Sequence, residues 1–562
     1  MSLLSFTGKR WIPGTDMRSA LAVPGCDVSA TVVQLLQQER QLRTATDNRQ
    51  TKLLYPDMQR AVERTWQAVD RQEKVMIFGD YDCDGITSAA QLVRFFRRHA
   101  VQPLVRLPNR LTEGYGLKDH HIQEVLDANI QLLITADTGI ASVEEIRRAK
   151  EAGIDVIILD HHTMHAEIPA AYAILHPLLS ADFPRPYPAA AGVVYAFVRS
   201  LEEARGNPLW TDCDTDAALA AIGTIADLVE LKGENRRLVQ EGIAALARCT
   251  SGPLALLVSQ AGLGTAITSR DVAFRLAPRI NAAGRMDNPA IALAALLGDD
   301  LSSLPLLDEL NQRRQQQVRG FMTEASASFI GSTSPLIFLA RPEYSSGIVG
   351  LIAGKLTETF GKPSFVGSIQ GGTCTASLRS IPAYNIAEGL SRVSDVLTHF
   401  GGHAQAAGCH LPVHLLSELE RRLAADIAGH VDASELSPFL VADVILDPRH
   451  ISARLHADMC ALEPFGQGNL EPRFLLPGVM LGDVRRCGAD GAHLQAKLHA
   501  HKLIGFGLGH IAHHVNQPVD LLCRIGMDTY MGRTSVQLFV DDVRVAREMP
   551  VMLPIETITG LV

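Results

Sequence analysis

Carboxylate and imidazole side chains follow three short apolar runs in the first third of the sequence. Each run has the length and composition of a buried strand. The runs are Val75–Phe78, followed by Asp80, Asp82 and Asp84; Leu132–Ala136, followed by Asp137; and Val156–Leu159, followed by Asp160, His161 and His162. Because the carboxyl ends of parallel strands meet at one edge of an open α/β sheet, these groups are expected to converge. Only a cation stabilises so many carboxylates in one place, so the pattern predicts a metal centre.

Two other interpretations exist for the first motif, Asp-x-Asp-x-Asp-Gly. An EF-hand calcium loop begins in the same way, but it needs a glutamate at its twelfth position and flanking helices. Counted from Asp80, that position is Gln91, and the preceding segment has the pattern of a strand. A solvated acidic turn would account for any one of the three motifs, because Asp and Gly commonly follow strands, but it accounts poorly for all three.

Together with Asp227, these residues resemble the motifs of the DHH phosphoesterase superfamily, which is named for its Asp-His-His, and in particular those of its exonucleases specific for single-stranded DNA. Further matching segments extend the resemblance from about residue 50 to near the C-terminus. They are Glu113–Leu117, Arg275–Arg285, Gly401–Ala404 with Ala406–Gly408, and Glu463–Asn469. The resemblance implies an exonuclease that degrades single-stranded DNA from the 5′ end to mononucleotides in DNA repair and recombination. It also implies a single-stranded-DNA-binding protein and a helicase as partners.

Two alternatives remain open. The first is a DHH phosphodiesterase acting on short oligonucleotides or cyclic dinucleotides, or a pyrophosphatase; a C-terminal β module argues against it, since a small substrate needs no extended grip. The second is a catalytically silent DNA-binding scaffold. Retention of every expected acid argues against a scaffold, because unneeded buried carboxylates are costly.

The resemblance implies a role for each metal ligand. Two divalent ions, Mn²⁺ or Mg²⁺, suit an oxygen-rich site with some imidazole. Asp82 would hold one ion, Asp84 and Asp227 would hold the other, and Asp137 would bridge the pair.

The remaining catalytic candidates have less specific roles. His161 and His162 would complete the ligand shell or contact the phosphate. Asp80 would ligate an ion or orient a water molecule, and Asp160 would ligate directly or orient the ligands. His403 would donate a hydrogen bond to the scissile phosphate.

Substrate binding is assigned to a second group of residues. Arg110 and Arg379 are expected to hold a 5′-phosphate or the DNA backbone, because the planar guanidinium binds phosphate through two hydrogen bonds. Tyr115 is expected to stack on a base. The other candidates are Arg279, Asn281 and Arg285, in a segment without helical periodicity, and Ser377, Gly401 and Gly402 in the matching motifs. An ordinary surface role is the alternative for each arginine.

Four positions depart from the family pattern. The family commonly has Gly where this chain has Leu378, His where it has Ser345, Pro where it has Leu470 and Asn where it has His176. None of the four is a predicted metal ligand. The departures therefore bear on recognition of the strand end more than on hydrolysis, with Leu378 expected to alter the approach of the backbone to the phosphate.

Composition predicts a large cytoplasmic enzyme. The 562 residues are 47% hydrophobic, enough for several packed domains. Nine cysteines without a Cys-x-x-Cys pair disfavour a zinc site or a disulfide framework and suit a reducing compartment. No signal-peptide pattern or membrane-spanning apolar run is present, so no membrane association is expected. The net charge of −9 argues against a generally basic nucleic-acid binder, so any DNA path must be a local basic strip.

The expected fold class is α/β with a C-terminal all-β domain. Residues 1–50 are predicted to pack on the catalytic domain through a Gln-rich helix. Residues 51–300 form a DHH domain with a parallel sheet and helices near residues 86–99, 117–128 and 142–152. Residues 301–330 form a connecting helix, and residues 331–432 form the DHH-associated (DHHA1) α/β domain, with a Gly-rich turn at residues 401–403. Residues 433–562 form an OB-fold that binds nucleic acid.

Overall fold

The computed structural model describes residues 5–13, 28–40, 54–164, 166–207, 213–329, 331–530 and 533–546. The chain divides into two compact units. The parallel-sheet unit contains Leu42–Gln317 together with the separate segment Glu463–Leu470. The mixed-sheet unit contains Met1–Gln41, Val318–Leu462 and Glu471–Val562.

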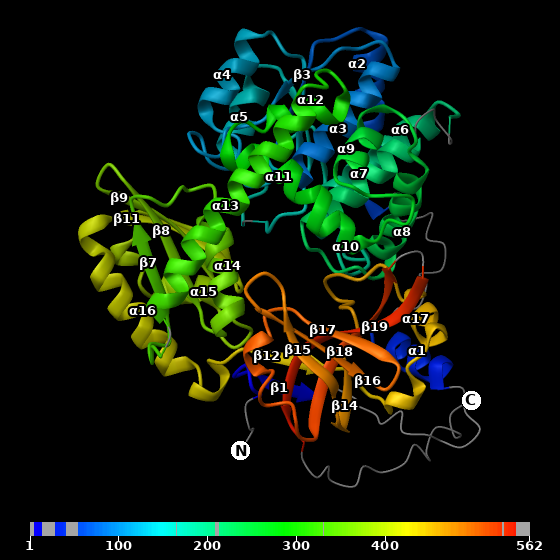
Figure 1. Ribbon diagram of the computed structural model, residues 1–562. Coiled ribbons are helices and arrows are strands. Elements are labelled where there is room, and N and C mark those ends of the chain that lie inside the picture. The colour runs from blue at the N-terminus through cyan, green and yellow to red at the C-terminus, as the bar shows by residue number, and fades with distance from the viewer. Residues whose placement is uncertain are drawn as a thin grey trace. The chain divides into compact units, whose positions relative to one another are not determined.

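The parallel-sheet unit is built around five strands, all parallel, in the order β3-β2-β4-β5-β6. Figure 1 labels β3, one edge strand of this sheet. The strands are β2 (Val75–Gly79), β3 (Leu104–Arg106), β4 (Leu132–Ala136), β5 (Asp155–Leu159) and β6 (Ala173–Leu175). Every residue of β2 and β4 is buried, which explains their continuous apolar sequences. The predicted parallel sheet is confirmed.

Helices cover both faces of this sheet. Ile77 and Ile134 face a core shared with α2 (Met58–Asp70), α3 (Cys83–Arg98), α6 (Ala190–Ala204) and α7 (Cys213–Ala226). Phe78 and Leu133 face the opposite core, shared with α4 (Asp119–Asp127) and α5 (Val143–Glu151). Successive side chains of a strand point to opposite faces, so both faces of β2 and β4 are covered.

A helical layer completes the unit. It consists of α8 (Gly233–Arg248), α9 (Gly252–Gln260), α10 (Ser269–Asp271), the π-helical turn Val272–Leu276, α11 (Ala277–Met286), α12 (Ala290–Leu297) and α13 (Ser303–Phe329). The segment without helical periodicity that carries Arg279, Asn281 and Arg285 forms most of α11. Alanine and glycine line the buried face of this helix, so its sequence shows little hydrophobic periodicity. The predicted connecting helix is α13, which runs across the boundary between the two units at Gln317.

The mixed-sheet unit contains the expected second α/β domain. Its sheet has the order β10-β11-β9-β8-β7, with only β7 and β8 parallel. The elements are β7 (Ile337–Arg341), α14 (Val349–Phe360), β8 (Ser364–Gln370), β9 (Thr373–Arg379), α15 (Ile386–Arg392), β10 (His399–His403), β11 (Ala406–Pro412) and α16 (Leu416–His430). The predicted turn at residues 401–403 is wrong, because Gly401–His403 pair with Ala406–Gly408 as the edge strand of a hairpin.

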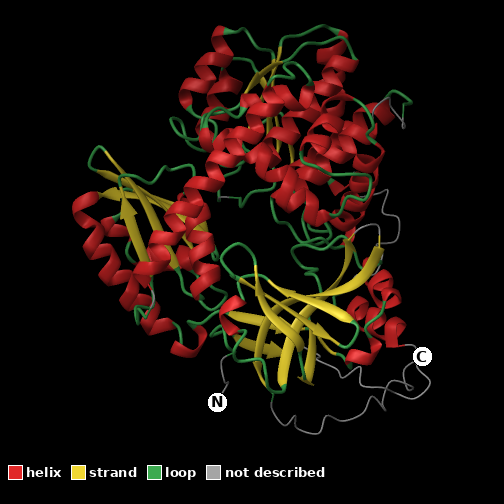
Figure 2. Ribbon diagram, viewed as in Figure 1, coloured by secondary structure: helices red, strands yellow, loops and turns green. Residues whose placement is uncertain are grey.

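The C-terminal part of this unit is all β, as the OB-fold prediction requires (Figure 2). Seven strands have the order β13-β14-β18-β19-β17-β16-β15. The strands are β13 (Val444–Ile445), β14 (Phe474–Val479), β15 (Gly482–Cys487), β16 (His493–Leu498), β17 (His501–Gly505), β18 (Val519–Tyr530) and β19 (Arg533–Val545), with α17 (Ala453–Cys460) between β13 and β14.

The N-terminal segment packs on this β domain. Strand β1 (Arg10–Pro13) pairs in parallel with β12 (Phe439–Ala442), and Trp11 Nε1 donates to Asp542 at 2.7 Å. Helix α1 (Val28–Glu39) contacts α17, where Ser29 donates to Asp458. The prediction that residues 1–50 pack on the catalytic domain is therefore wrong for residues 5–13 and 28–40, because the free edge of β12 accepts β1. Residues 14–27 and 41–50 lie outside the described residues.

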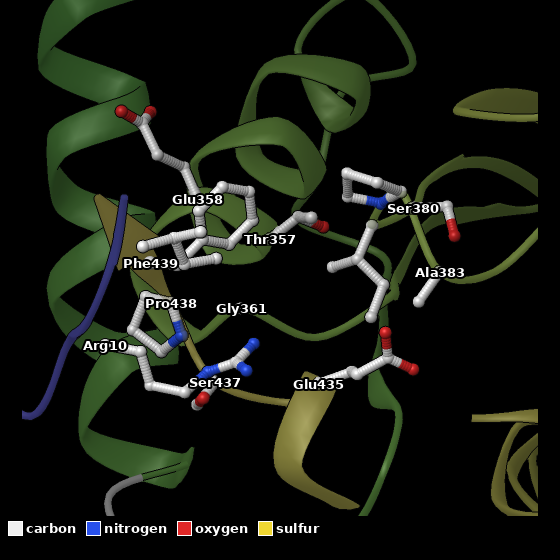
Figure 3. A pocket seen from close by; sticks show the side chains of 13 residues that line it. Arg10, Thr357, Glu358, Gly361, Ser380, Ala383, Glu435, Ser437, Pro438 and Phe439 are labelled. Carbon is white, nitrogen blue, oxygen red and sulfur yellow. The ribbon is translucent and has the colours of Figure 1, made fainter. Parts of the chain in front are cut away.

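A cavity of about 440 Å³ lies in the mixed-sheet unit beside β1 and β12 (Figure 3). Its walls carry Arg10 as well as Glu358 and Glu435, together with the hydroxyls of Ser380 and Ser437. Charges of both signs line it, so the cavity lacks the positive character of a phosphate site.

No single helix among the described residues is both long and apolar enough to cross a membrane; only α8 and α9 taken together, with a bend of 88° between them, meet the length and composition criteria.

Candidate metal centre

The first cluster of acids lies where β2 leads into α3. Asp82 is the N-cap of α3, and its Oδ1 accepts the N–H groups of Asp84 at 3.0 Å and Gly85 at 3.1 Å. Asp84 lies in the first turn of the helix and is 1% exposed. Its two carboxylate oxygens accept the N–H groups of Ala190 at 2.8 Å and Ala191 at 2.9 Å, at the start of α6. Backbone donors have no sequence signature, so sequence analysis did not find these anchors.

Asp137 follows β4 with a left-handed backbone, φ +64°. Most side chains adopt this conformation at a cost of about 1 kcal/mol, although Asp and Asn tolerate it better than others. Its N–H donates to the Leu159 carbonyl at 2.9 Å, which ties the end of β4 to the end of β5. The carboxylate is 2% exposed, and its Oδ1 has no hydrogen-bond partner among the described residues.

His161 brings the three strand ends together. Its Nε2 lies 3.3 Å from Asp137 Oδ1, 3.6 Å from Asp227 Oδ2 and 3.8 Å from Asp84 Oδ2. Asp227 directly follows α7, so this helix contributes to the centre as well as the strands. The predicted convergence of the motifs is thus seen within one unit.

Asp160 holds the two histidines. Its fully buried carboxylate accepts the N–H groups of Ile140, His161 and His162, and its Oδ1 lies 2.7 Å from His162 Nδ1. Burial alone would raise its pKa, but the hydrogen bond with His162 and the histidine charges lower the pKa of Asp160 to about 2. Burial lowers the pKa of His162, yet the bond to Asp160 and the surrounding carboxylates raise it to about 9. Of its two proposed roles, this geometry favours orientation of the ligands by Asp160.

The donor set fits two divalent cations. Three groups of donor atoms each lie within 4.8 Å of one another: Asp80, Asp82 and Asp137; Asp84, His161 and Asp227; and Asp137, His161 and His162. Within the described chain, Asp80 Oδ1, Asp137 Oδ1 and His161 Nε2 are buried without a hydrogen-bond partner. Burial and neighbouring carboxylates raise the pKa of Asp84 to about 7 and that of Asp227 to about 9. Cations would satisfy the unpartnered atoms and remove this repulsion.

Two predicted substrate residues lie beside the centre. The Tyr115 hydroxyl is 3.2 Å from His162 Nδ1 and 3.4 Å from the Asp137 carbonyl. The Arg110 guanidinium lies over the ring of Tyr81, 4.7 Å from its centroid, and its charge acts on Asp80. Both side chains are therefore within reach of a phosphate held at the metal centre.

Residues of α11 support the first acidic loop. Asn281 Oδ1 accepts the N–H of Cys83 at 3.0 Å, and Arg279 Nε donates to Asp308 at 2.5 Å. The charge of Arg285 acts on Tyr81 in the same loop. The contacts of Arg279 and Asn281 are thus with the protein itself, and they brace the Asp80–Asp84 loop.

Gly284 makes the close packing of α11 possible, because a Cβ there would lie 2.3 Å from the Tyr81 carbonyl oxygen. We expect Gly284→Ala to displace the Asp80–Asp84 loop and to lower kcat at least tenfold. Gly320→Ala is a matched control, since a Cβ at that helical position meets nothing within 4 Å. Steady-state kinetics of both variants, with melting temperatures, checks this; equal rates would show that the packing is unimportant.

The remaining predicted residues lie in the mixed-sheet unit. Ser377 and Arg379 are on β9, while Gly401, Gly402 and His403 are on the exposed edge strand β10. Leu378 lies between Ser377 and Arg379 and is fully buried in the domain core, on the opposite face of β9. The Leu378 side chain therefore does not lie on the face of β9 that carries Ser377 and Arg379, and its expected effect on the approach of the backbone to the phosphate stays a prediction.

His176 is a positioning residue that sequence analysis noted only as a departure. It is fully buried, with Nε2 2.8 Å from the His162 carbonyl oxygen and Nδ1 accepting the N–H of Leu178 at 3.1 Å. We expect His176→Leu to lower kcat roughly tenfold, since losing a buried hydrogen bond costs about 1–3 kcal/mol and frees His162. His176→Asn, which retains a donor and an acceptor, should keep most of the activity. Rates of the two variants at saturating DNA test this; equal losses would contradict it.

The sequence of this chain is similar to those of known proteins. Family models match residues 74–224 (DHH family, N-terminal domain), 333–428 (DHHA1 domain) and 442–542 (RecJ OB domain). The single-stranded-DNA-specific exonuclease RecJ of Bacillus subtilis (strain 168) is 33% identical over 507 residues, covering 87% of this chain and 63% of that protein. RecJ of Thermus thermophilus is 33% identical over 487 residues, covering 85% of this chain and 69% of that protein.

Similarity to a solved structure agrees with these sequence matches. The crystal structure of RecJ from Thermus thermophilus in complex with Mn²⁺ matches with a TM-score of 0.80 and 28% identity, over 93% of this chain and 76% of that chain. The chain thus spans less than two thirds of the Bacillus subtilis protein and about three quarters of the solved one. On these grounds the chain belongs to the family of the single-stranded-DNA-specific exonuclease RecJ.

Proposed function

We propose that this protein is a divalent-metal-dependent exonuclease that hydrolyses single-stranded DNA. One observation carries the proposal: in a chain of the RecJ family, Asp137 belongs to two adjacent groups of metal-binding donor atoms. We further propose that cutting runs from 5′ to 3′, releases 5′-mononucleotides and serves DNA repair and recombination. Residues 51–300 would hydrolyse, residues 331–432 would hold the strand end, and residues 433–562 would grip the strand.

The centre would hold two Mn²⁺ or Mg²⁺ ions. Asp80, Asp82 and Asp137 would hold one ion, and Asp84, His161 and Asp227 would hold the other. Asp137 also belongs to a further group of donor atoms, with His161 and His162, so it is the residue proposed to bridge the pair. When bound, the pair generates hydroxide near neutral pH and stabilises the attacking and leaving oxygens of the phosphoryl transfer. Asp160 would keep the ring of His162 oriented, and the Tyr115 hydroxyl donates to the Asp137 carbonyl at the same edge.

The strand end is held by β9 and the N-terminus of α14. Ser377 and Arg379 point to the same face of β9, toward Gly350 in the first turn of α14. A guanidinium, a hydroxyl and the N–H groups of a helix N-terminus are all donors suited to a terminal phosphate. Arg110, in the parallel-sheet unit, and His403, on β10, are also proposed to contact the DNA strand.

Labelled single-stranded DNA, duplex DNA, dinucleotide and pyrophosphate, each with and without Mn²⁺, test the function. We expect metal-dependent release of mononucleotides from single strands only, with 5′-labelled strands losing their label first. Preference for dinucleotide or pyrophosphate would support the small-substrate alternative, and DNA binding without any cleavage would support a scaffold. A cytoplasmic location and cooperation with a single-stranded-DNA-binding protein or a helicase are part of the same proposal.

A further inference from the structure

The segment Glu463–Leu470 belongs to the parallel-sheet unit although the residues on both sides of it belong to the mixed-sheet unit. It is one of the motifs singled out in the sequence, and neither metal binding nor DNA contact accounts for it. We refer to it as the strap. Its own hydrogen bonds give it a fixed shape: Gly466 and Asn469 are paired through their backbones, and the fully buried Asn469 donates through Nδ2 to the Pro464 carbonyl at 2.9 Å.

Side chains of the parallel-sheet unit, two of them buried, hold the base of the strap. Arg236, 6% exposed, donates through Nη2 to the Glu463 carbonyl at 2.6 Å, and Gln240 donates to the same oxygen at 3.1 Å. Ser269, 1% exposed, donates to the Phe465 carbonyl at 2.6 Å. A buried guanidinium is costly to leave without partners, so the carbonyl oxygens of the strap that accept from Arg236 stabilise this contact.

The tip of the strap lies against the short connection between α7 and α8. Leu231 N–H donates to the Gln467 carbonyl at 2.8 Å, and Gly466 lies against the Leu231 side chain. Gly468 has φ +74°, and a Cβ on it would be 3.0 Å from Glu230 Oε2 and 3.1 Å from Glu230 Cβ. Any other residue at position 468 would therefore strain the backbone, and its Cβ would press against the Glu230 side chain.

The connection between α7 and α8 begins with Asp227, a residue of the candidate metal centre. Asp227 is followed by Leu228 with φ +61° and by Val229, Glu230 and Leu231. Among the described residues, no hydrogen bond fixes the Asp227 carboxylate, which is 27% exposed and contacts His161. Asp84, in contrast, is held by two backbone N–H groups. The position of Asp227 thus depends on the backbone that carries it.

We propose that the strap is a positioning element for Asp227. By holding Glu230 and Leu231, it fixes the connection between α7 and α8 and places the Asp227 carboxylate beside Asp84 and His161. The metal site of one unit is in this way completed by chain that lies between two segments of the other. The inference rests on the proposed metal-dependent function, and it assigns Gly468, Asn469 and Arg236 a role in metal affinity without contact to the metal.

Calorimetric titration of the intact protein with MnCl₂, without DNA, tests the proposal. Wild type should bind two ions, and Gly468→Ala should weaken one of them at least tenfold while the other stays within twofold. Gly252→Ala is the matched control, because Gly252 in the same unit has φ +83° and a Cβ there meets nothing within 4 Å. Gly252→Ala should bind both ions like wild type. In DNA cleavage, excess Mn²⁺ should restore kcat of Gly468→Ala, with KM for DNA unchanged.

The outcomes separate this proposal from the function on which it rests. A wild type that binds no Mn²⁺ would overturn the proposed function and the strap's role together. If Gly468→Ala binds two ions with wild-type affinity, only the strap proposal is overturned. The same holds if Gly252→Ala weakens Mn²⁺ binding as much as Gly468→Ala does. If Gly468→Ala does not fold, Asn469→Ala, which loosens the strap from within, decides by the same titration. Hydrogen exchange on wild type needs no variant: fast exchange of the Leu231 amide would also refute the proposal.

Discussion

Replacing Asp137 with alanine is expected to abolish hydrolysis. Asp137 Oδ1 lies 3.3 Å from His161 Nε2, and the carboxylate belongs to two of the three groups of donor atoms at the centre, so its loss is expected to uncouple the two proposed metal positions. We expect a fall in kcat of at least a thousandfold, because the two ions that this carboxylate would hold together would stabilise both the attacking and the leaving oxygen. Cleavage of single-stranded DNA in saturating Mn²⁺ measures this.

Asp137→Asn separates loss of charge from backbone strain. Asparagine tolerates the left-handed conformation at this position, whereas alanine does not share that preference. The metal-free Asn variant should melt at or above the wild-type temperature, since burial and neighbouring acids raise the pKa of Asp137 and removing one acid relieves repulsion. Asp299→Ala, at an exposed ion pair in the same unit, is the control and should leave the rate unchanged. A near wild-type rate for either Asp137 variant would refute the two-metal site.

A 5′-phosphorylated strand is expected to be cut faster than a 5′-hydroxyl strand, by about tenfold or more, since a hydrogen bond to a charged group contributes about 1.5–3 kcal/mol. Arg379, which lies on β9 beside Ser377 and the start of α14, is proposed to supply this contact. Arg379→Ala should remove most of the preference while slowing cleavage of the hydroxyl strand much less. Rates on both strands, for both proteins, are the measurement.

Arg421→Ala is a suitable control for this experiment. Arg421 lies on α16 of the same domain in an exposed pair with Glu418, so its loss should leave the preference intact. Equal cleavage rates of the wild-type enzyme on 5′-phosphorylated and 5′-hydroxyl strands would rule out the proposed binding of the terminal phosphate by Arg379. Direct obstruction by the Leu378 side chain would not be the explanation, because this side chain is buried on the other face of the strand.

Much of the metal centre was predictable from local sequence. An apolar run that ends in Asp or His specifies both a buried strand and the group at its end, and parallel pairing brings these ends to one edge. The strand ends at Asp80, Asp137 and Asp160 could therefore be placed together without a structure. Asp227 was different: it follows a helix rather than a strand, and only resemblance to a family indicated it.

Tertiary structure decided what depends on contacts between distant segments. The carbonyl of Gln467 that holds Leu231, the N–H groups at Ala190 and Ala191 that hold Asp84, and the edge of β12 that accepts β1 are all backbone groups. Every residue carries such groups, so the residue type does not indicate which of them will form these hydrogen bonds. The sequence by itself determined which side chains could bind metal and where the strands end. Only the fold determined which distant backbone holds them in place, because that choice follows from packing rather than from spacing along the chain.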